Sequence, residues 1–309
     1  MKREVLIRVP LDEDWLTRLS ENFIVHDMVD PATFAAFPAE RRAKVQAVIA
    51  GTRAKFTADD IASMPELAII HTIGAGTEAI DIDAASARGI VVISNSGTNA
   101  ASVADHAMAL AMSLIRDVPA MHAGTVTGGW PVAERPQLTG KRVGILGLGA
   151  IGGAIAQRMA GFDTTIAYHS RRKVADVPWR YCAGPGELAD FSDVLMVTIP
   201  ATAETHHVID AGLLARLGRN GFVVNVGRGA TIDTAALAEA LGSGAIAGAA
   251  LDVFEGEPEL PEILRTAPNL VVTPHVAGFS PEARRDAGER ILANLAAFFD
   301  GKPVIGRVN

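Results

Sequence analysis

The glycine-rich stretch at residues 141–153 constrains the fold of this chain more than any other feature. It reads Lys-Arg-Val-Gly-Ile-Leu-Gly-Leu-Gly-Ala-Ile-Gly-Gly and contains the pattern G-x-G-x-x-G at Gly147, Gly149 and Gly152. An apolar run typical of a strand precedes the pattern, and small and apolar residues typical of a helix follow it. In such a turn the first glycine permits the tight bend and the second lets the backbone approach a pyrophosphate. The third lets the helix pack on the strand, so that the positive helix end faces the phosphates.

The pattern alone is weak evidence, because glycine occupies 30 of 309 positions. At that frequency chance supplies about 0.3 such matches per chain. The context strengthens it, since a second apolar run at Thr164–Tyr168 follows after roughly 20 residues, as in a βαβ unit. We therefore predict a dinucleotide site. The residues assigned to it from this turn are Gly147, Gly149, Ala150, Ile151 and Gly152.

The end of the second predicted strand indicates which dinucleotide binds. An NAD site usually has an acidic residue there for the ribose 2′-hydroxyl, but this chain reads Tyr-His-Ser-Arg-Arg at 168–172, with no carboxylate before Asp176. A hydroxyl and two guanidinium groups suit a phosphate dianion, which a carboxylate would repel. We therefore predict NADP(H), bound by Ser170, Arg171 and Arg172. The alternative is a basic loop that is merely solvated.

Composition excludes several classes of protein. A net charge of −7 and a pI near 5.6 argue against a nucleic-acid partner. No apolar run approaches the roughly 18 residues of a membrane helix, and the N-terminal apolar run is too short and too charged for a signal peptide. The single cysteine, Cys182, excludes an intramolecular disulfide framework. We expect a cytoplasmic protein that binds neither a membrane nor nucleic acid.

The first hundred residues alternate strand-like and helix-like runs, which predicts a parallel sheet built from βαβ units. The predicted strands are Val5–Val9, Phe23–Val25, Val45–Ile49, Ala68–Thr72 and Val91–Ile93. The predicted helices are Asp12–Ser20, Thr57–Met64 and Asp83–Arg88, with Asp12, Thr57 and Asp83 as N-caps.

A long apolar helix over Asn99–Ile115 leads through a loop to the glycine pattern. Six predicted strands with helical crossovers then make a dinucleotide-binding lobe: Val143–Leu146, Thr164–Tyr168, Val194–Ile199, Phe222–Val226, Ala247–Leu251 and Leu270–Thr273. A last helix over Pro281–Asp300, capped by Ser280, can return to the first lobe. We predict an α/β protein of two Rossmann-like or flavodoxin-like lobes with parallel sheets and a cleft between them. Residues 1–98 and 281–309 form the substrate domain, and residues 99–280 the dinucleotide-binding domain.

Polar side chains follow three consecutive strands of the second lobe. Arg228 follows the strand at 222–226, Glu257 the strand at 247–251, and His275 the strand at 270–273. Ligands of open α/β sheets bind beyond the carboxyl ends of the strands, so these three would converge on a nicotinamide. Each residue also has an explanation that involves no function. Arg228 could be an exposed charge in a loop, and Glu257 could lie in a polar turn before proline. His275 could be a loop histidine whose hydrogen bonds are made within the fold.

Over essentially its whole length the chain resembles the D-isomer-specific 2-hydroxyacid dehydrogenase family. The resemblance rests on the glycine pattern and on Val-Gly-Arg-Gly at 226–229, Leu-Asp-Val-Phe-Glu-Gly-Glu-Pro at 251–258 and Pro-His-Val-Ala-Gly at 274–278. It extends to Gly-Ala-Gly-Thr-Glu-Ala-Ile-Asp at 74–81 and Ser-Val-Ala-Asp-His at 102–106. The basic stretch at 168–172 is similar to the NADP-dependent glyoxylate/hydroxypyruvate and 2-ketogluconate reductase branch.

The resemblance implies roles for these side chains. His275 would protonate the substrate carbonyl oxygen as hydride arrives, and Glu257 would hydrogen-bond its imidazole and stabilise the protonated form. Arg228 would orient the substrate carboxylate and carbonyl. Further substrate contacts would come from His275 and from the backbone of Ile73, Gly74, Ala75 and Gly76. Further cofactor contacts would come from Val103, Pro200, Asp252 and Gly278.

One position departs from the commonest family pattern. Asp105 stands where many members have glutamate, which puts in doubt any role that needs the longer side chain. Trp130, in Gly-Gly-Trp, resembles a tryptophan that enters the partner's site in the reductase branch. It could equally be a packing residue between subunits or domains.

We predict NADPH-dependent reduction of glyoxylate, hydroxypyruvate and similar short 2-keto acids to D-2-hydroxy acids, without a metal ion. The alternative among enzymes is a 2-ketogluconate reductase or a reductase of broader 2-keto acid range. An alternative of another class is a dinucleotide-sensing corepressor or scaffold, which can keep the same residues. The resemblance also implies a homodimer with its contact near Asn99–Met121.

Overall fold

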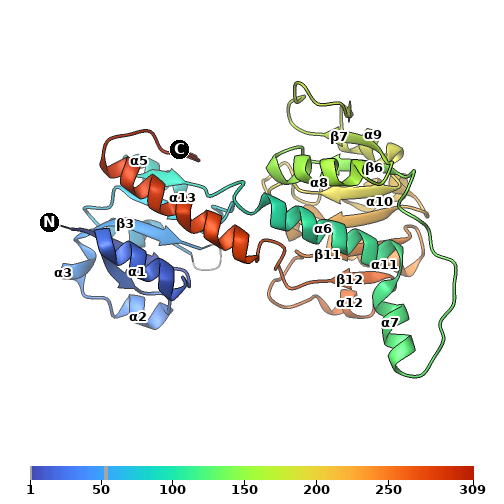
Figure 1. The fold of residues 1–309 in the computed structure, drawn as a ribbon, viewed down its shortest axis with the longest axis horizontal. Coiled ribbons are helices and arrows are strands. Elements are labelled where there is room, and N and C mark those ends of the chain that lie inside the picture. Colours follow the sequence, from blue (N-terminus) through green and yellow to red (C-terminus); the bar gives the residue numbers. More distant parts are fainter. Residues whose placement is uncertain (1, 52–54) are drawn as a thin grey trace. The chain divides into compact units, whose positions relative to one another are not determined.

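The computed structural model describes residues 2–51 and 55–309 and divides into two compact units. The first unit consists of Met1–Asn99 together with Ser280–Asn309, and the second of Ala100–Phe279. In Figure 1 the first unit therefore carries both the blue and the red end of the colour range. Each unit has its own parallel sheet and its own core, and each is described here by itself.

The first unit is built on a five-stranded parallel sheet of order β2-β1-β3-β4-β5, the flavodoxin-like order. Its strands are β1 (Arg3–Arg8), β2 (Phe23–Asp27), β3 (Val45–Ala50), β4 (Ile69–Thr72) and β5 (Val91–Ile93). Successive side chains of a strand point to opposite faces. Val5 and Ile7 of β1 accordingly face one core cluster, while Leu6 faces another.

Helices cover both faces of this sheet. Leu19 of α1 (Glu13–Asn22) and Ile291 and Leu295 of α13 (Pro281–Phe299) pack on the face of Val5 and Ile7. The opposite face is covered by α2 (Pro31–Ala35), α4 (Ala58–Ala62) and α5 (Ile82–Ala87), and a short helix, α3 (Ala39–Arg42), lies between α2 and β3 in the chain. The C-terminal segment therefore completes the core of the N-terminal one.

The second unit is built on a seven-stranded parallel sheet of order β12-β11-β10-β9-β6-β7-β8. Its strands are β6 (Arg142–Leu146), β7 (Thr165–His169), β8 (Arg180–Tyr181), β9 (Val194–Val197), β10 (Phe222–Asn225), β11 (Gly248–Leu251) and β12 (Leu270–Val272). The order reverses between β6 and β9, as in the doubly wound nucleotide-binding fold. The prediction of six strands missed β8, which is only two residues long.

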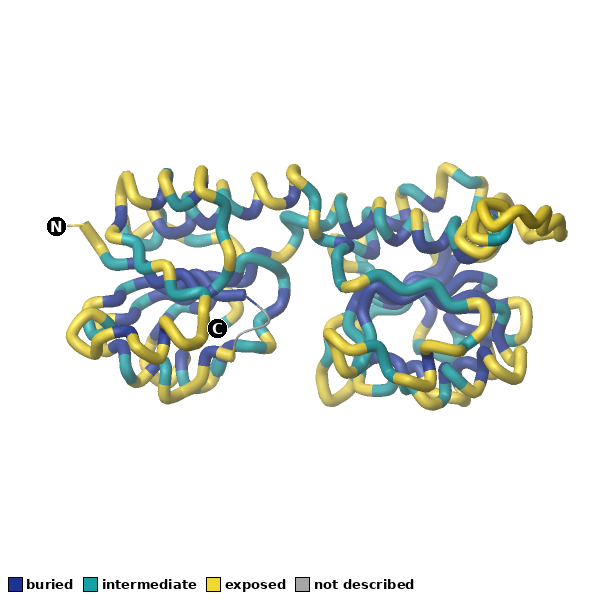
Figure 2. The backbone as a smooth tube through the Cα atoms, turned by 90° about the horizontal axis from the view of Figure 1, so that it is seen from below, coloured by how far each residue is buried: buried dark blue, intermediate teal, exposed yellow. Residues whose placement is uncertain are grey.

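Two helix layers sandwich this sheet. On one face lie α6 (Ala100–Ile115) and α8 (Ala150–Ala160), and on the other α9 (Pro185–Phe191), α10 (Ala211–Leu217) and α11 (Thr234–Gly242). Figure 2 shows the strands of each sheet dark blue between helices whose outer sides are exposed. The helices α7 (Val118–Val126) and α12 (Glu262–Arg265) complete the unit.

The helix caps test the local sequence patterns. Thr57 forms a capping box with Asp60, and the Ser280 hydroxyl accepts from the Ala283 amide, as predicted. The predicted cap at Asp83 is wrong, because Asp81 caps α5 by accepting from the Ala84 amide. Within the described ranges, no helix is both long enough and apolar enough to span a membrane.

Candidate active site

The glycine turn follows β6 at the point where the strand order of the second unit reverses. Gly147 has φ +99°, a conformation that side-chain-bearing residues rarely adopt. A Cβ on Gly152 would lie 2.0 Å from the carbonyl oxygen of Gly147, so this glycine is required by close packing of α8 on the strand. The first and third glycines of the pattern are therefore needed by the fold itself.

The second glycine differs, because a Cβ on Gly149 would meet nothing within 4 Å. Its φ of −86° is also ordinary, so neither packing nor backbone conformation requires glycine here. Gly149 is the N-cap of the 11-residue helix α8, whose first amides lack intrahelical partners and favour an anion. Open space beside a helix N-terminus fits the close approach of a pyrophosphate.

The end of β7 carries the basic residues expected to select the cofactor. Arg171 and Arg172 are exposed, and the Ser170 hydroxyl donates to the backbone oxygen of Arg172 across 2.7 Å, which closes the turn. His169 is fixed by a 2.9 Å contact between its Nδ1 and the backbone oxygen of Cys182. The turn thus presents two guanidinium groups to solvent immediately after the second strand of the nucleotide fold.

Arg228 follows β10 in a turn whose backbone is held by hydrogen bonds to a buried side chain. The buried Asn225 donates from Nδ2 to the Arg228 carbonyl oxygen (3.0 Å), while its Oδ1 accepts from the Gly227 amide (3.0 Å). A Cβ on Gly229 would lie 2.2 Å from the backbone of Phe254, so the turn after β10 packs directly on the turn after β11. Arg228 is therefore held next to the segment that carries Glu257.

The structure brings Glu257 and His275 into direct contact. Nδ1 of His275 lies 2.7 Å from Oε2 of Glu257, and the two side chains are 39% and 31% exposed. Oε1 of Glu257 accepts a 3.1 Å hydrogen bond from the Phe254 amide, which orients the carboxylate. With Nδ1 donating to the carboxylate, Nε2 is the nitrogen left for a ligand.

Several neighbours determine the ionisation of Glu257. Burial opposes its ionisation, but the hydrogen bond and charge of His275, the Phe254 amide and the charge of Arg228 outweigh it. The pKa of Glu257 therefore lies below its ordinary value, and the residue is a carboxylate at neutral pH. The contribution of Arg228 to this pKa is a further sign that all three predicted residues lie in one region.

Asp252 anchors the loop that carries His275. It is 1% exposed, and its carboxylate accepts hydrogen bonds from the amides of Val276 (2.9 Å) and Ala277 (3.0 Å) and from Thr273 Oγ1 (2.6 Å). The backbone oxygen of Asp252 also accepts from the His275 amide at 2.9 Å. His275 itself has φ +54°, an uncommon value for histidine. The loop is thus held in a specific conformation, and a cofactor contact by Asp252 stays a prediction.

His106 supports this loop from α6, a role that the sequence does not predict. Nε2 of His106 lies 3.0 Å from Thr273 Oγ1 and 3.5 Å from Asp252 Oδ1. In the sequence His106 stands out only as part of a family motif, because nothing there indicates that α6 packs beside β12. The neighbouring Asp105 instead points to α8, where it pairs with Arg158 at 2.6 Å.

The other predicted cofactor contacts are scattered through the second unit. Val103 belongs to α6 and its side chain is buried in the core, whereas Pro200 is exposed after β9. Ala150 is exposed at the start of α8, and Ile151 and Gly278 are partly buried. These contacts stay predictions.

The predicted substrate loop, residues 73–76, follows β4 of the first unit. The Gly74 carbonyl oxygen accepts from the Asn95 amide (3.0 Å) and from Thr72 Oγ1 (2.6 Å), and the Ala75 oxygen accepts from Ser94 Oγ (2.8 Å). By contrast, the amides of Gly74, Ala75 and Gly76 donate to no other residue that the structure describes. The loop therefore offers three donors, while the carbonyl oxygens of Gly74 and Ala75 are already engaged, which suits an anion site.

Comparison with known proteins shows which family the chain is similar to. The family model described as "D-isomer specific 2-hydroxyacid dehydrogenase, NAD binding domain" matches residues 108–277. A glyoxylate/hydroxypyruvate reductase of Arabidopsis thaliana is 35% identical over 300 residues, covering 96% of this chain and 93% of its own. A 2-ketogluconate reductase of Gluconobacter oxydans is 32% identical over 307 residues, covering 98% of each.

A solved structure is similar over the whole chain. It is the NADPH-dependent glyoxylate/hydroxypyruvate reductase of Sinorhizobium meliloti in complex with NADP and malonate. The TM-score is 0.90 with 34% sequence identity, covering 100% of this chain and 97% of that one.

Proposed function

The chain belongs to the D-isomer specific 2-hydroxyacid dehydrogenase family, and we propose that it is an NADPH-dependent reductase of glyoxylate, hydroxypyruvate and similar short 2-keto acids. The observation that carries the proposal is the 2.7 Å contact between His275 and Glu257 beyond the strands of a dinucleotide-binding sheet. A histidine oriented by a carboxylate is the arrangement expected of a general acid.

In the proposed reaction this chain's residues bind the keto acid and move one proton. His275 donates a proton from Nε2 to the substrate carbonyl oxygen, and Glu257 stabilises the imidazolium before the transfer. Arg228 binds the substrate carboxylate and carbonyl through its planar guanidinium group. NADPH, when bound, would supply the hydride for the carbonyl carbon, and with the proton from His275 this would give the 2-hydroxy acid.

The cofactor assignment is supported by the exposed pair Arg171 and Arg172 and by the open space beside Gly149. We propose that Ser170, Arg171 and Arg172 bind the 2′-phosphate of NADPH and that the α8 N-terminus binds the pyrophosphate. The amides of residues 74–76, which donate to no residue in the described part of the chain, support a role for that loop in binding the substrate carboxylate. Val103, Pro200, Asp252 and Gly278 are proposed as further cofactor contacts.

The direct test is NADPH oxidation with glyoxylate and hydroxypyruvate by the full chain and by His275→Ala and Arg228→Ala variants. Loss of the general acid is expected to lower kcat about 10²- to 10⁴-fold. The exposed Arg219→Ala variant, in the loop after α10, is the control and should keep full activity. Activity that survives both site substitutions would remove the proposed roles.

Two other functions are separated by a substrate panel. Preference for 2-ketogluconate over the short keto acids would identify the broader reductase activity that the Gluconobacter oxydans relative suggests. Tight NADPH binding without turnover of any 2-keto acid would instead support a dinucleotide-sensing corepressor or scaffold. The panel therefore includes glyoxylate, hydroxypyruvate, 2-ketogluconate and phenylpyruvate, each assayed with NADPH and NADH.

We also propose a cytoplasmic homodimer whose contact includes residues 99–121 and the segment after them. Four large apolar side chains of α7 and the following loop are 49–83% exposed: Val118, Val126, Trp130 and Val132. Several exposed apolar side chains within one short segment favour a protein partner. Light scattering of the wild type and of Trp130→Ala measures the subunit number, and kinetics of the same variant distinguish a packing role from a role in the partner's site.

A further inference from the structure

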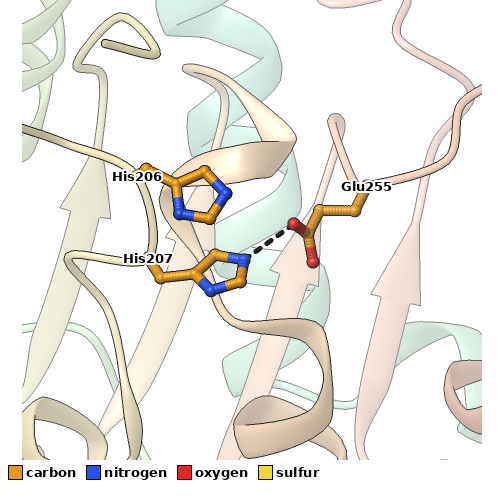
Figure 3. Close-up of side chains that lie close together, drawn as sticks. All are labelled: His206, His207 and Glu255. Carbon is orange, nitrogen blue, oxygen red and sulfur yellow. Dashed lines mark hydrogen bonds and ion pairs between the residues drawn. The ribbon is translucent and has the colours of Figure 1, made fainter. Parts of the chain in front are cut away.

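One group of metal-ligand side chains lies in the second unit outside the site proposed above. Among the described residues, His206, His207 and Glu255 form the single group of three or more potential ligands close enough to share an ion. The two histidines lie in the loop between β9 and α10, and Glu255 follows β11. Figure 3 shows the imidazole rings side by side, with the Glu255 carboxylate directed toward His207.

We propose that His206, His207 and Glu255 form a binding site for a divalent transition-metal ion such as Zn²⁺ or Ni²⁺. Two imidazole nitrogens and one carboxylate oxygen are a ligand set that zinc uses in proteins, with a water molecule as fourth ligand. Imidazole ligands favour Zn²⁺, Ni²⁺ and Cu²⁺, whereas Mg²⁺ and Ca²⁺ prefer oxygen alone.

The distances allow coordination after a small movement. The three ligand atoms all lie within 4.8 Å of one another, and a zinc ion with bonds of about 2.0–2.2 Å holds its ligands roughly 3–4 Å apart. His207 Nε2 and Glu255 Oε1 are already 2.8 Å apart. The exposed His206 ring, stacked at 3.9 Å between centroids on His207, is the ligand that must turn.

Glu255 is prepared as a ligand by its second oxygen. Oε2 accepts hydrogen bonds from the Thr234 hydroxyl (2.5 Å) and the Thr234 amide (3.3 Å), so Oε1 is left to face the histidines. An anchored carboxylate of this kind is characteristic of metal sites.

A second carboxylate lies near His207. Oδ2 of Asp233 is 4.0 Å from Nδ1 of His207, beyond hydrogen-bond distance but on the side of the ring opposite Nε2. The His207 amide donates to the Ala230 carbonyl oxygen at 2.9 Å, which fixes the backbone at this position. Metal-binding histidines commonly have such a carboxylate near the ring nitrogen that does not bind the metal.

An ion pair between His207 and Glu255 alone is the competing explanation, and in that case His206 has no role in binding an ion.

The test is Zn²⁺ titration of the untagged, chelator-treated full chain by calorimetry, with Ni²⁺ and Mg²⁺ in parallel. We expect one equivalent of Zn²⁺ or Ni²⁺ to bind and Mg²⁺ not to bind. His206→Asn and Glu255→Gln should each weaken Zn²⁺ binding about tenfold or more.

His206→Asn is the decisive variant, because this exposed side chain makes no hydrogen bond to the described residues and its loss should leave the melting temperature unchanged. His122→Asn, another exposed histidine, is the matched control and should bind Zn²⁺ as the wild type does. Unchanged Zn²⁺ binding by His206→Asn, or no binding by the wild type, would overturn the proposal. The titration needs neither cofactor nor keto acid, so its failure is distinct from failure of the proposed reductase activity.

Discussion

Nδ1 of His275 lies 2.7 Å from Oε2 of Glu257, although the two residues belong to loops after different strands. The Glu257 carboxylate is held by the Phe254 amide, and the His275 loop is held by Asp252. The pair is therefore positioned by two independent sets of backbone hydrogen bonds. This relationship leads to the first two predictions.

Replacing Glu257 with glutamine keeps a hydrogen-bonding group but removes the negative charge beside the imidazole. We expect Glu257→Gln to lower kcat about 100-fold, because the charged carboxylate that hydrogen-bonds Nδ1 of His275 is lost. The measurement is kcat with NADPH and glyoxylate at neutral pH. Glu259→Gln, two residues away and exposed, is the control. An unchanged kcat in Glu257→Gln would contradict the assignment.

Asp252→Asn tests the anchor of the catalytic loop. The asparagine amide group would face a buried backbone amide of Val276 or Ala277, placing two donors together. An unsatisfied buried donor costs about 1–3 kcal/mol, so urea unfolding should show a loss of that size together with reduced kcat. The exposed Asp163→Asn variant should retain both stability and activity. Full stability of Asp252→Asn would show that the loop does not depend on this carboxylate.

The glycine turn offers a matched pair of substitutions. Gly152→Ala should destabilise the second unit by about 1–3 kcal/mol, since its Cβ would lie 2.0 Å from the Gly147 oxygen. Gly149→Ala should melt like the wild type, because nothing lies within 4 Å of its Cβ, yet bind NADPH more weakly. Thermal unfolding and fluorescence titration with NADPH measure the two effects. Wild-type cofactor affinity in Gly149→Ala would argue against pyrophosphate binding there.

Removing both guanidinium groups after β7 tests the choice of cofactor. Each charge-assisted hydrogen bond contributes about 1.5–3 kcal/mol, so the double variant Arg171→Gln with Arg172→Gln should shift the preference from NADPH toward NADH by more than about 100-fold. The ratio of kcat/KM for the two cofactors measures this shift. The neighbouring exposed Lys173→Gln is the control. Equal losses with both cofactors would exclude a 2′-phosphate contact.

The buried His71 predicts sensitivity of the first unit to acid. Burial lowers the pKa of His71 to about 4, against an ordinary 6.5, despite the hydrogen bond to the Thr72 carbonyl oxygen. Above pH 6.5 His71 is neutral in both the folded and the unfolded chain. As the pH falls below 6.5, only the unfolded chain takes up the proton, so stability declines until the pH reaches the folded pKa.

Between pH 7 and pH 5 this single group is expected to remove about 2 kcal/mol of unfolding free energy. Urea unfolding at the two pH values, compared with His71→Gln, isolates the effect because the other titrating groups are shared. The variant should lose correspondingly less stability on acidification. Parallel losses in both proteins would show that His71 is not responsible.

Local patterns predicted much of this fold, and the failures have physical causes. Thr57 and Ser280 were recognisable as caps because the signal lies within one helical turn. β8 could not be predicted, since Arg180–Tyr181 is too short to show alternation and exists only by pairing with β7. Similarly, α7 has apolar residues without a periodic face, so the sequence pattern does not distinguish it from a loop.

The residues of the two sites divide in the same way, into those that local sequence predicts and those that depend on contacts between distant parts of the chain. The positions of Arg228, Glu257 and His275 followed from the rule that ligands bind beyond strand ends, and from family resemblance. The anchoring by Asp252 could not be foreseen, because the hydrogen bonds join residues 24 and 25 positions apart in the chain. The contact between His207 and Glu255 spans 48 positions, and no sequence motif joins them.

The return of α13 to the first unit has a consequence for biosynthesis. Ile291 and Leu295 complete the hydrophobic face formed by Val5 and Ile7, but the ribosome reaches them only after translating every residue of the second unit. The nascent second unit, continuous in sequence, can fold as soon as it emerges. Until then this face of the N-terminal sheet is covered only by α1, so apolar side chains of the newborn polypeptide stay exposed where a chaperone can bind them.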